Sequence, residues 1–339
     1  MRRTDLCWTV LPFRACQLIS LAMLTAVERR ANASVDSCFP KDDLSPCINS
    51  DALWLQPDGG VLATLPDPAK RDRGSLVFRF ALSYQLNPIG LRIASPDPSG
   101  TTLHVVHHAL SAVPMWDYSV TQRLHLSLAA PFSVYQNGAG LSDLRGTNDE
   151  LSRSSIRDAR VGVSMHEWAH QGASGHHDAT ARIEFSFPTG QSGGFASDQT
   201  VVAAPSLIYG YAGPRFEFRA QGGARLRREV EFANVSVGSQ LALGMGASYR
   251  ILKKPSLSIA GELNALLPLI ERRDALPPAP AEGLLSVSSV LTRGLSGGLG
   301  AGSGFSLAHT QALFAPDVRS LLWLTYSAAP GTSRMTTLQ

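Results

Sequence analysis

From Ser75 onward, apolar and polar residues alternate along the chain. Between 75 and 84, apolar side chains from Leu76 to Tyr84 occupy every second position, and polar or smaller residues separate them. The same alternation occurs at 123–128, 180–187 and 215–221, and its longest run covers 234–249. Successive side chains of a β-strand point to opposite faces, so this pattern predicts strands with one apolar and one polar face.

Twelve such segments can be counted, and the connections between them differ in length. The predicted strands cover 75–90, 102–115, 121–132, 156–168, 178–188, 200–211, 214–226, 232–251, 255–268, 282–293, 295–306 and 319–328. Short connections fall at 119–122, 172–177, 212–213, 253–255 and 293–294, and longer polar ones at 91–101, 133–155, 189–199, 269–281 and 307–318. Short turns at one end and long loops at the other are typical of transmembrane barrels. We therefore predict an all-β fold, an antiparallel transmembrane β-barrel of about twelve strands over residues 74–328.

A soluble β-sandwich or lipocalin-like barrel would also alternate. Two features favour the membrane barrel: strands as long as the roughly 9–11 residues that a tilted membrane strand needs, and the asymmetry of the loops.

The N-terminus has the features of an export signal. A basic start, Met1-Arg2-Arg3, precedes the uncharged stretch 15–27, and Ala31-Asn32-Ala33 offers a cleavage site. We expect residues 1–33 to be a signal peptide, 34–73 a periplasmic N-terminal segment and 329–339 a C-terminal tail. The expected location is the bacterial outer membrane.

Two of the four cysteines, Cys38 and Cys47, lie after the expected cleavage site. They flank a short polar loop, and an oxidising periplasm favours a disulfide between them. Two free thiols are the alternative.

Removal of residues 1–33 takes away five of the 30 Lys and Arg residues and two of the 27 Asp and Glu residues, which leaves 25 of each. A chain with no net charge is unlike a nucleic-acid-binding domain, which has a basic excess. No segment after the signal has 18 consecutive apolar residues, so helical membrane spans are not expected.

The polar faces of the predicted strands would line the lumen. The predicted lumen residues are Arg79, His125, Arg182, Glu184, Arg215, Glu217, Arg219, Arg225 and Glu262, joined by Asn264. Barrel interiors use such groups to line a wet pore or to fill the bore with ion pairs. Five arginines against three glutamates favour anions if the pore is open.

One motif carries a different hypothesis. His166-Glu167-Trp168-Ala169-His170 matches H-E-x-x-H, and His176 lies where a third zinc ligand would follow. That motif needs a helix, whereas residues 159–165 alternate as a strand, in which positions four apart are roughly 13 Å from each other. We therefore predict that these histidines lie at the end of a strand and match the motif by chance. The alternative is a secreted zinc metalloprotease that uses His166, Glu167 and His170.

His104, His107 and His108 form another histidine group with no second ligand cluster. We expect no metal ligands, no cofactor and no enzymatic activity.

Several runs resemble a known family. Residues 131–141, 157–163, 187–190, 223–227 and 238–241 are similar to myxobacterial outer-membrane barrels, which often precede an OmpA-type peptidoglycan-binding domain. The resemblance covers about residues 50–328, and its motifs mark turns and strand ends. Only thirteen residues follow Tyr326, so the peptidoglycan-binding domain is not expected here. The resemblance implies outer-membrane lipids as surroundings, with periplasmic chaperones and the barrel-assembly machinery as partners. The predicted function is a passive small-solute channel or a structural envelope component.

Overall fold

The computed structural model describes residues 45–58, 60–93, 101–142, 150–172, 175–232, 235–253, 256–269, 279–307 and 313–328. The signal peptide, Cys38 and the C-terminal tail lie outside these residues, so the predictions made for them stay predictions. Within the described residues, no helix has the length and apolar character needed to cross a membrane.

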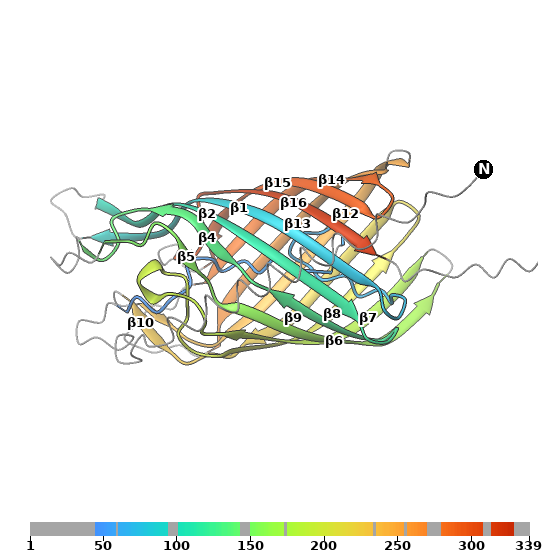
Figure 1. Cartoon of the computed structure of the whole chain (residues 1–339), viewed down its shortest axis with the longest axis horizontal. Helices are drawn as coiled ribbons and strands as arrows, with labels where there is room; N and C mark the ends of the chain where they lie inside the picture. Colours follow the sequence, from blue (N-terminus) through green and yellow to red (C-terminus); the bar gives the residue numbers. More distant parts are fainter. Residues whose placement is uncertain are drawn as a thin grey trace, which may run out of the picture.

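The wall of the molecule is one antiparallel sheet that closes on itself (Figure 1). Its strands are β1 (Leu76–Ile93), β2 (Thr101–Ser119), β3 (Leu124–Ala129), β4 (Phe132–Asn137), β5 (Ser155–Ile156), β6 (Ala159–Gln171), β7 (His176–Phe187), β8 (Val202–Ala212), β9 (Phe216–Arg225), β12 (Gln240–Lys253), β13 (Ser256–Pro268), β14 (Pro280–Thr292), β15 (Leu295–Ser306) and β16 (Val318–Ala328). β1 pairs with both β2 and β16, and these two ladders close the barrel. Closure leaves no open edge whose backbone groups would face lipid.

Two of these fourteen strands continue a neighbour in the chain. β3 and β4 both pair with β2 and are separated only by Ala130 and Pro131, where proline has no N–H to give to the ladder. β5 precedes β6 by two residues and extends it. The wall therefore has twelve strands, which confirms the predicted fold class, and each predicted segment overlaps one of them.

The alternation in the sequence separates the two faces of the wall. Along β16, Val318, Ser320 and Leu322 are exposed on the outside, whereas Arg319 and Leu321 are buried inside. The most exposed outward side chains include Leu285 at 73% and Leu207 at 69%. Apolar residues thus face outward where lipid would lie, and polar residues face a closed interior.

The short turns all lie at one end of the barrel, on the right in Figure 1, and the long loops lie at the other. The turn Arg293–Gly294 joins β14 and β15 with two residues, and the φ of 82° at Gly294 suits glycine in such a hairpin. The predicted strand 232–251 needs a correction, because its first part leaves the wall. There, β10 (Val230–Phe232) pairs with β11 (Val235–Val237) in a separate two-stranded sheet, and the wall strand begins at Gln240.

Residues 45–58 and 60–71, together called the plug below, run through the barrel from the long-loop end to the short-turn end. At the long-loop end, Ser45 N donates to Glu231 O, and at the short-turn end Gly74 N donates to Ser119 O, in the last residue of β2. Most plug residues between them are buried. The prediction of a periplasmic segment over 34–73 is corrected for these residues, because their backbone pairs with inward side chains of the wall.

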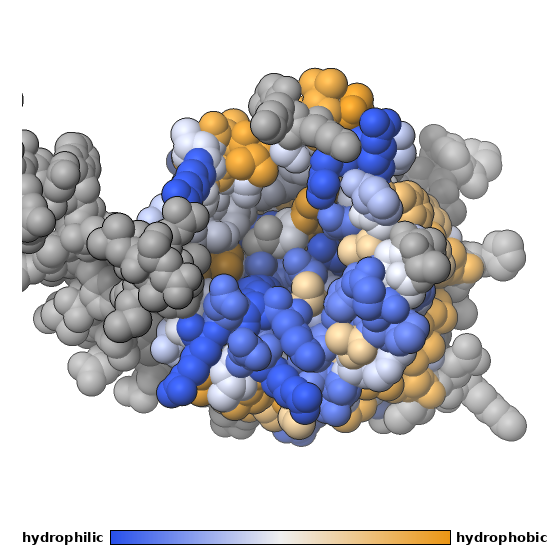
Figure 2. All heavy atoms as spheres, turned by 90° about the vertical axis from the view of Figure 1, so that its right-hand side faces the viewer, coloured by the Kyte–Doolittle hydropathy of each residue, from blue (hydrophilic) through white to orange (hydrophobic). Residues whose placement is uncertain are grey.

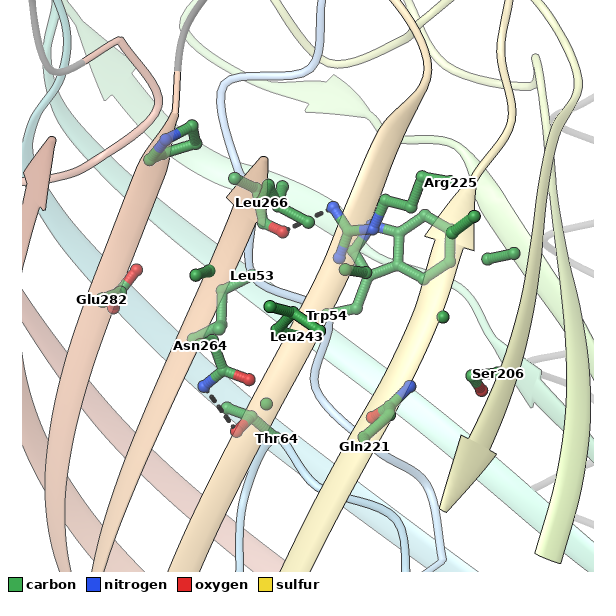
Figure 3. A pocket seen from close by; sticks show the side chains of 18 of the residues that line it. Leu53, Trp54, Thr64, Ser206, Gln221, Arg225, Leu243, Asn264, Leu266 and Glu282 are labelled. Carbon is green, nitrogen blue, oxygen red and sulfur yellow. Dashed lines mark hydrogen bonds between the residues drawn. The ribbon is translucent and has the colours of Figure 1, made fainter. Parts of the chain in front are cut away.

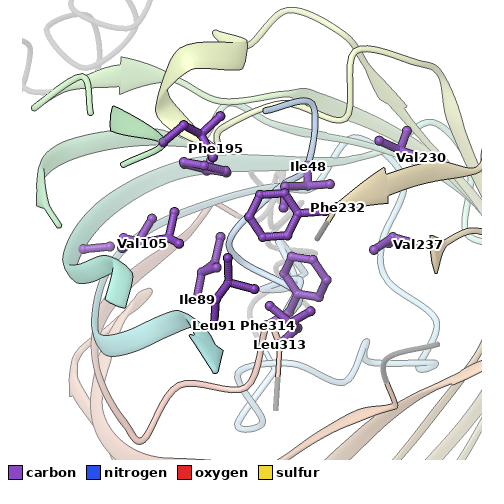
Figure 4. Close-up of a cluster of buried hydrophobic side chains, with 13 residues drawn as sticks. Ile48, Ile89, Leu91, Val105, Phe195, Val230, Phe232, Val237, Leu313 and Phe314 are labelled. Atoms are coloured by element: carbon purple, nitrogen blue, oxygen red, sulfur yellow. The ribbon is translucent and has the colours of Figure 1, made fainter. Parts of the chain in front are cut away.

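Apolar side chains close the long-loop end. Ile48 of the plug packs in a buried cluster with Phe195, Phe232, Leu313 and Phe314, which come from loops and from β10 (Figure 4). Phe195 and Phe232 meet edge to face with ring centroids 5.8 Å apart. The cluster joins the start of the plug to the loops and caps the barrel with a small hydrophobic core.

A second set of apolar contacts fixes the middle of the plug against the wall. Leu53, Leu55 and Ala63 pack on inward residues of β1, β2, β14 and β16, among them Trp323. On the opposite wall, glycines make room for the plug. A Cβ atom added at Gly210 would lie 2.5 Å from Pro68 Cγ, and one at Gly244 would lie 2.7 Å from Leu65. The inner surface is therefore shaped to the plug.

The assignment of faces can be tested on one strand. Leu285 faces outward at the middle of β14, and Ser288 faces the bore on the same strand. We expect Leu285→Arg to destabilise the membrane-inserted barrel by roughly 2–4 kcal/mol, because the arginine would face the hydrocarbon core. Ser288→Arg is the control and should fold nearly as well as the wild type. Folding yield into lipid vesicles, read from heat-modifiable migration on gels, measures both. Equal yields for the two variants would show that the faces are assigned wrongly.

Candidate functional site

The bore of the barrel is the candidate site, and arginines of the wall bind the plug there. Arg79 of β1 donates to the carbonyl oxygens of Gln56, at 3.0 Å, and of Gly60. Three more arginines each donate to one plug carbonyl, namely Arg160 to Leu55 at 3.1 Å, Arg219 to Leu65 at 3.3 Å and Arg225 to Ala52 at 2.7 Å. An extended segment inside a barrel has no ladder partners, so side chains of the wall supply the donors that its carbonyls need.

Glu262 of β13 supplies the matching acceptors. Its two carboxylate oxygens accept from the backbone N–H groups of Ala63 and Thr64, both at 2.8 Å, and Oε2 also accepts from Thr64 Oγ1 at 2.5 Å. Asn264, one inward position further along, donates to the same hydroxyl at 2.9 Å. Both side chains lie inward as the sequence predicts, and together they hold the middle of the plug.

Ion pairs fix the end of the plug at the short-turn end. Arg71 Nη1 of the plug lies 2.5 Å from Asp117 Oδ1 of β2, and Asp67 Oδ1 lies 3.5 Å from Arg219 Nη2. Pro68 O accepts from Thr180 Oγ1 at 3.1 Å and lies 2.8 Å from His166 Nδ1. The plug is thus bonded to β2, β6, β7 and β9 just before it turns into β1.

Arg319 forms the most buried charged group of the barrel. Its side chain is fully buried, donates to both oxygens of Glu282 and to Ser83, and reaches Asp51 of the plug at 2.9 Å. A buried charge is tolerated only when hydrogen bonds and opposite charges surround it, as they do here. Removing one of these partners is expected to lower the free energy of unfolding by several kcal/mol.

The remaining predicted lumen charges pair within the wall. Glu184 bridges Arg160 at 3.1 Å and Arg182 at 3.0 Å, and all three side chains are buried. His125 is also buried, with Nδ1 3.1 Å from Ser119 Oγ and 3.7 Å from Asp117 Oδ1. These side chains fill the bore between β3 and β7.

Beside the plug lies a cavity of about 70 Å³, against β8, β9, β12, β13 and β14 (Figure 3). Its lining combines apolar side chains, among them the rings of Trp54 and Phe314, with polar and charged ones: Gln56, Thr64, Glu184, Ser206, Gln221, Arg225, Asn264 and Glu282. The short-turn end of the molecule is hollowed and lined by hydrophilic side chains, whereas apolar side chains lie along its outer rim (Figure 2).

Eight of the nine predicted lumen residues lie on inward strand faces, and Arg215 does not. Arg215 is exposed in the turn between β8 and β9, where strand alternation no longer determines direction. Glu217 is half-buried near that end, 3.4 Å from Arg219 and 3.9 Å from Arg250. The sequence analysis missed Arg157, Arg160, Arg319 and Glu282. Arg160 stands on the polar face of an alternating segment, so a signal for it was present.

The H-E-x-x-H motif lies in strand β6 and is not helical. His166 points inward and is buried, Glu167 is exposed, and a bulge between His166 and Trp168 interrupts the register. His170 stacks on Trp168 with ring centroids 5.9 Å apart, close to the short-turn end. In the part of the chain that the structure describes, no three His, Cys, Asp or Glu side chains converge as a metal site. The arrangement gives no support to the zinc protease alternative.

The group His104, His107 and His108 lies near the long-loop end of β2. His108 Nδ1 lies 2.7 Å from Tyr84 Oη, and His107 Nδ1 lies 2.5 Å from Asn87 Oδ1. The three rings pack against one another, with centroids 5.4 Å apart for His104 and His107 and 4.0 Å apart for His107 and His108. These histidines bridge β1 and β2 where a bulge breaks their register.

Comparison with known proteins identifies no matching family model and no matching curated protein. Among solved structures, the COG4313 outer membrane channel from Pseudomonas putida F1 is similar, with a TM-score of 0.57 and 12% identity over 77% of this chain and 98% of that chain. The KdgM porin matches with a TM-score of 0.41 and 9% identity, over 74% and 98% of the two chains. The TodX monoaromatic hydrocarbon channel deltaS2 mutant matches with a TM-score of 0.45 and 8% identity, over 78% and 93%. The first likeness shows that the fold is that of an outer-membrane barrel channel.

The carboxyl group of Asp158 lies at the long-loop end of the barrel, in the two-residue break between β5 and β6, where it contacts the loop at 188–201. Asp158 is buried and accepts from the N–H groups of Gly190 at 2.9 Å and Asp198 at 2.8 Å. Burial and the neighbouring Asp198 carboxylate raise the pKa of Asp158 to about 6. The folded protein therefore holds this proton more tightly than the unfolded chain, whose aspartates titrate near 3.9. The bound proton therefore stabilises the folded state relative to the unfolded chain. This stabilisation is complete below pH ~4 and is lost as the pH rises through about 6.

We therefore expect the wild type to gain about 1 kcal/mol of stability from this group when the pH falls from 7 to 5. Asp158→Asn should lose that gain, because an amide does not titrate. Urea unfolding in detergent at the two pH values measures both proteins. An unchanged pH dependence in the variant would contradict the assignment.

Proposed function

We propose that the chain is an integral outer-membrane channel that passes small solutes along the side of a resident plug. The observation that supports this proposal is that the plug occupies the bore, yet a cavity lined by both polar and apolar side chains remains beside it on the β8–β14 side. Hydrophilic side chains also line the hollow at the short-turn end, so an aqueous path is supported from that side (Figure 2). A path of this size favours ions and very small solutes.

The strength of plug binding determines how far the path opens. Glu262 is the main acceptor for the plug backbone, and its three contacts involve only Ala63 and Thr64. Its loss would leave two buried N–H groups without their acceptor, at a cost of about 1–3 kcal/mol each. The plug would then lose the acceptor for its N–H groups near Ala63, whereas the arginine bonds to its carbonyls and its apolar packing would remain.

We also propose several features that the sequence predicts and that the described residues do not test. They are a cleaved signal over residues 1–33, a disulfide between Cys38 and Cys47, and origin in the group of myxobacterial barrels that the sequence resembles. Outer-membrane lipids would surround the outward apolar side chains, and the barrel-assembly machinery and periplasmic chaperones would act during biogenesis. The protein would act as a channel and not as an enzyme.

Planar-bilayer recording tests this function. We expect the wild type to conduct weakly in potassium chloride, and Glu262→Ala to raise the mean conductance several-fold, because the plug loses its central anchor. Ser288→Ala, a bore-facing change far from the plug anchor, is the matched control and should conduct like the wild type. Absence of conductance in all three folded proteins would instead favour a structural envelope role.

A further inference from the structure

The cavity beside the plug continues toward the long-loop end. A second cavity of about 30 Å³ shares five lining residues with the first, namely Ala52, Trp54, Arg225, Leu266 and Phe314. It adds Val202, Arg227 and Gln240 from the loop-side ends of the strands, and the carboxylates of Asp51 and Asp198. These two carboxylates are paired with Arg319 and Arg227, respectively. The two cavities form one crevice between the plug and the wall, called the plug crevice below.

Among the described residues, the arginines that line this crevice are Arg225 and Arg227. Arg225 Nη1 donates to Ala52 O at 2.7 Å, and the Arg225 guanidinium lies 4.2 Å from the centroid of the Trp54 ring (Figure 3). Within the described residues, no carboxylate lies within ion-pair distance of Arg225. Arg160, Arg182, Arg219, Arg227 and Arg319 each have such a partner. The charge of Arg225 is therefore not neutralised by a direct neighbour.

Arg227 adds a second set of donors. Its side chain is only 8% exposed, and Nη1 lies 2.8 Å from Asp198 Oδ1. Its Nε and Nη2 groups are buried and have no hydrogen-bond partner among the described residues. A buried donor without an acceptor is costly, so these N–H groups favour a water or an anion in the crevice that Arg227 lines.

We propose that the plug crevice binds a small oxyanion, a phosphate or a short carboxylate, between Arg225 and Arg227. A planar guanidinium binds two oxygens of such an anion at once, and its hydrogen bonds to charged oxygens are stronger than those to neutral ones. The two cavities, about 70 and 30 Å³, hold a few water molecules, so an ion of this size fits and a larger solute does not. The inference rests on the proposed function in one respect: it names the solute class that the path selects.

The test separates binding from conduction. Calorimetric titration of the detergent-purified full chain with inorganic phosphate measures binding directly, and a parallel titration with acetate shows which oxyanion is preferred. We expect saturable binding to the wild type and at least a tenfold weaker affinity in Arg225→Gln and in Arg227→Gln. Arg250→Gln is the matched control, because Arg250 lies at the other end of the barrel and pairs with Glu217. It should bind phosphate like the wild type.

Planar-bilayer recording supplies the second arm. Phosphate should reduce the chloride current of the wild type, and the block should be lost in Arg225→Gln but not in Arg250→Gln. Binding without conductance would keep the anion site and overturn the channel. Conductance with no binding of either oxyanion would keep the channel and overturn the site. Binding that survives in both folded Arg225→Gln and Arg227→Gln would also overturn it, because the anion would then lie elsewhere.

Discussion

An extended chain segment buried inside a barrel has to find hydrogen-bond partners for its backbone, and the rest of this structure depends on that constraint. The plug cannot use the ladders of the wall, which are already complete around the barrel. Inward side chains therefore supply both donors and acceptors: arginines for the carbonyl oxygens and Glu262 for the N–H groups. A bore without these side chains would leave buried backbone groups unsatisfied, at a cost of several kcal/mol in total.

This constraint also explains why so many arginines face inward. A surplus of lumen arginines over glutamates suggests a path for anions, yet most of these arginines bind plug carbonyls or carboxylates of the protein itself. Arg79 is 2% exposed and Arg319 is fully buried, so neither lies where a solute would pass. The guanidinium group suits this use because it stays charged and presents several donors in a fixed plane. Only a residue such as Arg225, which lines the crevice without a carboxylate partner, keeps its charge for a solute.

The interior consequently resembles the core of a soluble protein more than the water-filled lumen of a wide porin. Trp323 and Leu321 of β16 are buried against the plug, and glycines on β8 and β12 allow Pro68 and Leu65 to approach the wall. Such shape matching makes the plug part of the folded barrel. Any solute path is then a narrow crevice at one side of the plug, and its width changes with the contacts that hold the plug.

The sequence by itself determined the wall of this protein. Strand faces follow from a period of two, which is local, so all twelve strands were predicted, and eight of the nine predicted lumen residues face inward. The plug could not, because residues 45–71 have no periodicity and their partners lie far away in the chain: Glu262 is 199 residues from Ala63. One segment of the sequence indicates that protein and not water fills the bore: residues 321–324 in β16 are all apolar, so both faces of the strand are apolar there. Arg215 and the β10–β11 pair were misplaced because side chains in turns and loops take their direction from tertiary contacts. Arg225, Arg227 and Trp54 line one crevice only in the closed barrel with its plug in place. The strand pattern fixes which side chains face inward, but the contacts with the plug determine which of them have no carboxylate partner.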